Sequence, residues 1–169
     1  MSKEKISIVW FKKDLRINDN LALLSSSETN LPVLPLYIFE TDYWSQDFAS
    51  QRHWKFIHDC LIDLNKDLKK IGQSLIIRIG AANNIFKNII KNYDIQSVFA
   101  HQETGNSWTY KRDKDIRILL KKNKILFKEF PNNGVVRGLK DRNDWSKIRN
   151  SRMYKDNFES PLKLIPTNN

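Results

Sequence analysis

The chain has 169 residues, 40% of them hydrophobic and 28% charged, with a formal net charge of +10, which is ordinary composition for one basic globular domain. No apolar run approaches the roughly 18 residues of a membrane span, and the start Met-Ser-Lys-Glu-Lys leads into too short an apolar segment for a signal peptide. We therefore expect a soluble, cytoplasmic protein without a membrane partner. The single cysteine, Cys60, excludes an internal disulfide and a cysteine-based zinc cluster.

The first predicted element is a strand over residues 6–11, Ile-Ser-Ile-Val-Trp-Phe, whose unbroken apolar character is typical of a strand buried on both faces. The charged residues Lys12, Lys13, Asp14 and Arg16 follow its carboxyl end, and one of residues 18–20 is expected to cap a helix over 20–27. In open parallel α/β sheets, ligands bind at this edge, beside the first strand, where the strand order reverses.

Residues 10–23, in the order Trp-Phe-Lys-Lys-Asp-Leu-Arg-x-x-Asp-Asn-x-Ala-Leu, closely resemble the amino-terminal signature of the photolyase and cryptochrome flavoproteins. The resemblance continues through Leu34-Pro35-Leu36-Tyr37-Ile38-Phe39, Ser50-x-Arg52 and Arg112-Asp113. It implies that this chain is similar to the family's first domain, the α/β module that holds a light-harvesting antenna chromophore. The helical domain that holds the catalytic flavin in that family has no counterpart in this sequence.

Four further short apolar runs predict strands at 33–39, 75–79, 97–101 and 125–130. Between them, amphipathic helices are expected from about residue 50 to Gly72, over 82–92 and over 107–122, and a loop carries Tyr43, Trp44 and Phe48. The alternation predicts a Rossmann-like, doubly wound five-stranded parallel sheet of order 3-2-1-4-5 with helices on both faces. The sequence contains neither the dinucleotide-binding motif Gly-x-Gly-x-x-Gly nor the P-loop motif Gly-x-x-x-x-Gly-Lys-Ser/Thr. Their absence excludes NAD-dependent and P-loop enzymes.

Polar side chains at these strand ends define the predicted ligand site, which comprises Lys13, Glu40, Arg52, Glu103 and Asn106. By the resemblance, Glu103 is the acidic group that hydrogen-bonds the ring of an antenna chromophore of the folate, deazaflavin or lumazine/flavin type. Thr104 or Asn106 has a second interpretation, as the cap of the following helix. Asp42 is interpreted as a solvated loop carboxylate, and Asp113 is expected to pair with Arg117 on a solvated helix face. We assign no catalytic residue and no metal ligand.

The sequence changes after residue 133, so we predict an α/β domain over 1–133 and a basic loop with a truncated interdomain linker over 134–169. Residues 134–153 look most like those of certain bacterial cryptochrome-like proteins, a weaker resemblance than the first. No FAD is expected in this chain, which resembles deoxyribodipyrimidine photo-lyase but is predicted to be inactive alone.

Two functions remain open at this point. The first is an antenna-chromophore domain whose full-length relatives perform blue-light photoreception or light-driven repair of pyrimidine dimers. The second is an interaction module, or a split gene product, that docks a separately encoded FAD-binding helical domain without a ligand of its own. A universal-stress-type domain fits poorly because its glycine-rich phosphate segment is absent. The basic charge suggests non-specific DNA contact, but the lysine bias of an AT-rich genome would raise the charge without any binding site, and that is the favoured explanation.

Overall fold

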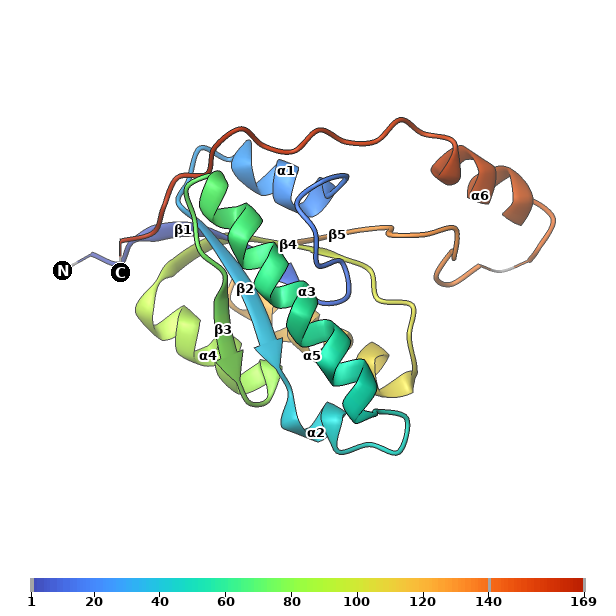
Figure 1. Ribbon diagram of the computed structural model, residues 1–169, viewed down its shortest axis with the longest axis horizontal. Coiled ribbons are helices and arrows are strands. Elements are labelled where there is room, and N and C mark those ends of the chain that lie inside the picture. The colour runs from blue at the N-terminus through green and yellow to red at the C-terminus, as the bar shows by residue number, and fades with distance from the viewer. Residues whose placement is uncertain (1, 140, 169) are drawn as a thin grey trace.

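The computed structural model describes residues 2–139 and 141–168, and its centre is a five-stranded sheet (Figure 1). The strands are β1 (Lys5–Phe11), β2 (Val33–Phe39), β3 (Ile76–Ile79), β4 (Asp94–His101) and β5 (Leu126–Phe130). All pairs are parallel, in the order β3-β2-β1-β4-β5, which confirms the predicted sheet. Strand β4 begins earlier than expected because Asp94 and Ile95 pair with Lys5 and Ile6.

Helices cover both faces of the sheet, as predicted. On one face, α4 (Ala82–Asn92) and α5 (Ser107–Lys122) pack on Ile8 and Trp10 of β1. On the other, α1 (Leu21–Ser27) and α3 (Gln51–Lys70) pack on Val9 and Phe11 of the same strand. Successive side chains of a strand point to opposite faces, so an unbroken apolar run supplies both cores at once.

The helix ends follow the expected capping chemistry. Asn20 caps α1 by accepting a hydrogen bond of 2.9 Å from the backbone N–H of Leu23. Ser50 caps α3 in the same way through His53. Gly72 lies just beyond the end of α3 with a φ of +92°, a left-handed conformation that glycine adopts without strain. Asn20 and Ser50 thus fix where α1 and α3 begin, and Gly72 marks where α3 ends.

Two helices differ from the sequence prediction. Residues 41–44, expected to be loop, form the single turn α2 (Thr41–Trp44), held by hydrogen bonds from Tyr43 and Trp44 to the Glu40 carbonyl. The segment after β5, expected to be irregular, contains α6 (Trp145–Met153). Helix α6 projects away from the sheet, and none of its residues is buried (Figure 1). A helix that packs on nothing needs no apolar stripe, so its sequence lacked the pattern by which the other helices were predicted.

The last residues return across the α1 and α3 side of the molecule to the opposite sheet edge (Figure 1). In this segment every third residue is buried, namely Pro161, Leu164 and Thr167. This spacing matches the three-residue turn of an extended polyproline-type chain. The backbone N–H of Leu164 donates to the carbonyl of Ile71 at 2.8 Å, and Val33 donates to Ile165 at 2.9 Å. We call residues 160–167 the strap. The predicted domain boundary at residue 134 stays a prediction.

No helix within residues 2–139 and 141–168 combines the length and the apolar character needed to cross a bilayer.

Candidate functional site

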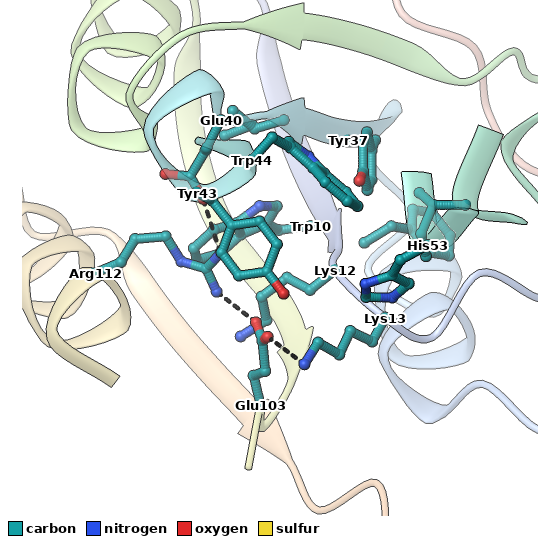
Figure 2. A pocket seen from close by; sticks show the side chains of 13 residues that line it. Trp10, Lys12, Lys13, Tyr37, Glu40, Tyr43, Trp44, His53, Glu103 and Arg112 are labelled. Carbon is teal, nitrogen blue, oxygen red and sulfur yellow. Dashed lines mark hydrogen bonds and ion pairs between the residues drawn. The ribbon is translucent and has the colours of Figure 1, made fainter. Parts of the chain in front are cut away.

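A pocket opens at the carboxyl edge of β1 and β2, where α2, α3 and α5 meet (Figure 2). Its charged and polar lining includes Lys13, Glu40, His53, Glu103 and Arg112. Its aromatic lining consists of Trp10, Phe11, Tyr37, Tyr43 and Trp44. The pocket therefore combines donors, acceptors and flat apolar surfaces at the edge where parallel sheets bind ligands.

Arg112, from the first half of α5, organises the charges of this pocket. Its guanidinium donates to Glu40 at 2.8 Å, to Glu103 at 2.6 Å and to Asp113 at 2.8 Å. It also lies 5.0 Å from the ring centre of Trp10. The three carboxylates outweigh the opposing effect of burial and raise the pKa of Arg112, so the guanidinium stays charged.

Glu103 lines the pocket, and its two carboxylate oxygens have different partners among the described residues. Its Oε2 accepts from Arg112, whereas the only side chain of the described residues that contacts its Oε1 is Lys13, at 3.1 Å. The Glu103 side chain is only 4% exposed, whereas the side chain of Lys13, which pairs with it in the pocket (Figure 2), is 49% exposed. A Cβ on Gly105 would lie 3.3 Å from the Lys13 Nζ and 3.4 Å from the Glu103 Oε1, so glycine keeps this contact open.

Glu40 has a structural task in addition to lining the pocket. Its Oε1 accepts a hydrogen bond of 3.1 Å from the backbone N–H of Ala82, at the start of α4, where Ala81 offers no side-chain cap. Its Oε2 accepts from Arg112. Burial raises the pKa of the Glu40 carboxyl, although Arg112 opposes that effect. Both oxygens of Glu40 are therefore engaged by the protein itself.

Asp113 lies behind the pocket in a second layer of buried charges. It is 2.9 Å from the Nζ of Lys12 and 3.5 Å from the guanidinium of Arg137, which comes from the segment after β5. The predicted pair between Asp113 and Arg117 is wrong, because Asp113 points into the sheet edge and Arg117 contacts Glu129 instead. Residues 113 and 117 lie on nearly the same face of α5, but the Asp113 side chain is 2% exposed and that of Arg117 is 52% exposed, a difference that spacing alone does not predict.

A model of the DNA photolyase family matches residues 7–145, which is most of the chain. The chain belongs to the DNA photolyase family. It is 38% identical over 105 residues to a relative from Arabidopsis thaliana named Cryptochrome DASH, chloroplastic/mitochondrial, a match covering 59% of the chain and 18% of the relative. It is 37% identical over 91 residues to the deoxyribodipyrimidine photo-lyase of Agrobacterium fabrum, covering 54% of the chain and 18% of that relative.

Solved photolyase-family structures share the fold over almost the whole chain. A Synechocystis cryptochrome superposes with a TM-score of 0.78 at 16% identity, and a class III photolyase from Agrobacterium tumefaciens with 0.77 at 24% identity. Each comparison covers 99% of this chain, but only 38% and 36% of the two larger chains. The chain thus spans well under half the length of the structures that it matches.

In this photolyase-family domain, Lys13, Glu40 and Glu103 line the pocket together, as the sequence analysis expected. Arg52 does not line it: its side chain is exposed in the first turn of α3, and the next residue, His53, turns toward the pocket instead. One residue corresponds to about 100° around a helix, so the two side chains leave in different directions. Whether any of these residues binds a chromophore stays a prediction.

Asn106 also lies outside the lining of the pocket. Its Oδ1 accepts a hydrogen bond of 3.0 Å from the backbone N–H of Thr109 and caps α5, which is the second interpretation that its sequence position offered. Asp42 is exposed, in agreement with its interpretation as a solvated carboxylate.

The aromatic rings of α2, Tyr43 and Trp44, form one wall of the pocket, and the sequence analysis did not predict this wall. The ring centres of Tyr43 and Trp44 lie 5.3 Å apart, Tyr43 lies 5.4 Å from Trp108, and Trp44 lies 5.3 Å from Trp54. The residues were visible in the sequence, but α2 is too short for a periodic signal. Arg112 was visible too, within a helix interpreted as a solvated basic face.

The lining fits a planar ring system that carries hydrogen-bonding groups on its edge. Glu103 can accept from a ring N–H, Lys13 can donate to a ring carbonyl, and Tyr43 and Trp44 offer aromatic contacts. The open volume is about 40 Å³, which holds only one or two water molecules. A ring can therefore enter only after Lys13 or Tyr43 moves. Among the described residues, no group of His, Cys, Asp and Glu side chains is arranged to hold a metal ion.

Proposed function

We propose that this photolyase-family domain binds a planar antenna chromophore of the folate, deazaflavin or lumazine/flavin type in the pocket between β1, β2 and α5. The observation that supports this proposal is the Oε1 of Glu103, a buried carboxylate oxygen whose one ion-pair partner among the described residues is the half-exposed Lys13. Hydrogen bonds to a buried charged group are worth about 1.5–3 kcal/mol, enough to orient a ring. When bound, such a chromophore absorbs blue or near-ultraviolet light and passes the excitation to a flavin.

In this proposal, the residues of the chain bind and orient the chromophore and perform no chemical step. Glu103 accepts a hydrogen bond from the edge of the ring, and Lys13 moves from Glu103 to a ring carbonyl. Arg112 keeps Glu103 in place from the opposite side at 2.6 Å. The aromatic wall of α2 excludes water and so strengthens these polar contacts. Names of relatives include both cryptochromes and photo-lyases, so photoreception and DNA repair are both compatible with the proposal.

A second candidate function is a docking module that pairs with a separately encoded FAD-binding helical domain and holds no ligand of its own. The observation that favours it is the open volume of about 40 Å³, because the protein's own side chains already fill the pocket. Both functions agree with a cytoplasmic protein, and that location is likewise a proposal.

The two candidates are distinguished by adding chromophores to the purified chain. We expect methenyltetrahydrofolate, an 8-hydroxydeazaflavin or FMN to co-elute with the chain in gel filtration, and its absorption band to shift when it leaves water for the aromatic pocket. If none of the three is retained at concentrations well above those of the protein, the antenna proposal is wrong and the docking module is favoured.

A further inference from the structure

A second, larger cavity lies at the carboxyl ends of β4 and β5, on the other side of β1 from the chromophore pocket. Its volume is about 280 Å³, against about 40 Å³ for the chromophore pocket. The residues just after α6 and the polar loop that follows β5 enclose it. We call it the histidine cavity, after His101 at the end of β4. Neither candidate function uses it.

His101 forms the base of this cavity and is held in one orientation. Its side chain is 5% exposed, and its Nδ1 lies 2.6 Å from the Oδ2 of Asp14, which is itself buried. Burial alone would raise the pKa of Asp14, but the hydrogen bond and charge of His101, together with backbone N–H groups, hold it below its ordinary value. Asp14 is therefore a carboxylate that fixes the Nδ1–H of His101.

His101 lines the histidine cavity and also a smaller cavity beside Gln102 and Thr104. Among the described residues no group hydrogen-bonds Nε2, and every fully buried side-chain nitrogen or oxygen there has a partner. Nε2 is therefore not fully buried and is open to at least one of these two cavities. An imidazole with both nitrogens protonated donates from each of them, so Asp14 at Nδ1 and an anion at Nε2 are partners of the same charged form.

Cationic side chains of the histidine cavity add to this preference for an anion. Arg152 lines it and is anchored by a hydrogen bond of 2.8 Å to the carbonyl of Val135, and Lys155 lines it without an ion pair among the described residues. Arg16 is already paired with Asp19 at 3.5 Å, and Asp156 is the other acid of the lining. The remaining wall includes the apolar side chains of Leu21, Pro131, Met153 and Phe158.

We propose that the histidine cavity binds a small organic anion, a phosphate or carboxylate on a compact apolar body. In this arrangement His101 Nε2, Arg152 and Lys155 contact the anionic group, and the apolar side chains of the wall contact the body of the ligand. The proposal is independent of the chromophore pocket, because the two cavities share no lining residue.

The chain has three histidines, so histidine NMR tests the proposal with internal controls. Phenyl phosphate is the probe, and benzoate and inorganic phosphate are the comparison anions. We expect the Cε1–H signal of His101 to shift in a saturable way with phenyl phosphate, and less with inorganic phosphate, which lacks the apolar body. His53, in the chromophore pocket, and His58, exposed on α3, should not shift. A saturable His101 shift with benzoate as well would support the proposal and show that the cavity accepts a carboxylate in place of the phosphate.

Two variants of equal charge provide the matched comparison. Lys155→Gln should weaken phenyl phosphate binding about threefold, as expected for an exposed charge contact. Lys147→Gln on α6, whose side chain is exposed and does not line the cavity, should leave the affinity unchanged. A titration in which His101 does not shift, in which all three histidines shift together, or in which both variants lose affinity equally would overturn the proposal.

Discussion

Asp113 is 1% exposed, and its carboxylate is surrounded by Lys12, Arg112 and Arg137. Replacing it with asparagine removes their shared buried carboxylate, although Glu40 and Glu103 still pair with Arg112 and Glu129 with Lys12 and Arg137. The cost should therefore lie at the lower end of that for breaking a buried pair, about 3 kcal/mol. We predict that Asp113→Asn lowers the free energy of unfolding in urea by about that amount. Asp115→Asn, two residues along and exposed, should change it by less than about 0.5 kcal/mol. Equal effects of the two changes would contradict the buried charge network.

The same carboxylate should make the fold sensitive to acid. Burial would raise the pKa of Asp113, but Lys12 and Arg112 hold it below its ordinary value of 3.8. Its stabilising effect is thus complete above the unfolded-state pKa and is lost as the pH falls through the lower folded-state pKa. We predict that the wild-type unfolding free energy falls below about pH 4, and that Asp113→Asn flattens this fall. An unchanged slope in the variant would contradict the assignment.

The sequence was sufficient to find Lys13, Glu40 and Glu103, because each follows a predicted strand and parallel strands end at one edge. It was insufficient where the direction of a helical side chain decides. Arg52 was chosen although its neighbour His53 lines the pocket, and Arg112 was missed as a pocket residue. Such choices depend on rotations of about 100° per residue. Arg52 lies in the first turn of α3, before the buried stripe that begins at Ile57, and the buried face of α5 includes the polar residues Thr109 and Asp113, so no apolar pattern indicated these directions.

The strap joins the end of the described chain to the core through Leu164, which is 1% exposed between α1 and α3. Removing a buried leucine side chain costs about 2–5 kcal/mol. We predict that Leu164→Ala lowers the unfolding free energy by an amount in this range, measured by urea denaturation. Leu162→Ala is the control, because Leu162 is 97% exposed in the same segment. Comparable losses in both variants would show that the strap is not packed as described.

Strands and long helices were predictable because each repeats one local pattern. Strand β2 has the predicted bounds, and the apolar stripe of α3 from Ile57 to Leu68 is buried as expected. The strap was interpreted as a linker because its period of three is neither helical nor β. Helices α2 and α6 have no interior-facing stripe, so only contacts distant in sequence reveal them, such as that of Tyr43 with Trp108.

The molecule as a whole carries 29 Lys and Arg against 19 Asp and Glu. We predict non-specific DNA binding that depends on salt, because each phosphate neutralised contributes a slope of about −0.9 in log affinity against log salt. Four phosphate contacts would weaken binding about 150-fold between 50 and 200 mM salt. Fluorescence anisotropy measures this salt dependence of the affinity, and an irradiated and an unirradiated DNA duplex should bind with the same affinity. An affinity that does not change with salt concentration, or a higher affinity for the irradiated duplex, would contradict the prediction.

Our proposal that a chromophore binds in the pocket lined by Lys13, Glu40 and Glu103 is tested with the Glu103→Gln variant. Its affinity for a chromophore that the wild-type chain retains is measured by quenching of tryptophan fluorescence. Loss of a charge-assisted hydrogen bond costs about 1.5–3 kcal/mol, which is a loss of at least about tenfold in affinity. Asp42→Asn removes an exposed charge at the same sheet edge and is the matched control. Our account predicts a weakening of tenfold or more for Glu103→Gln and none for Asp42→Asn, with urea denaturation showing both variants folded. A folded Glu103→Gln variant that binds the chromophore as tightly as the wild type would contradict it.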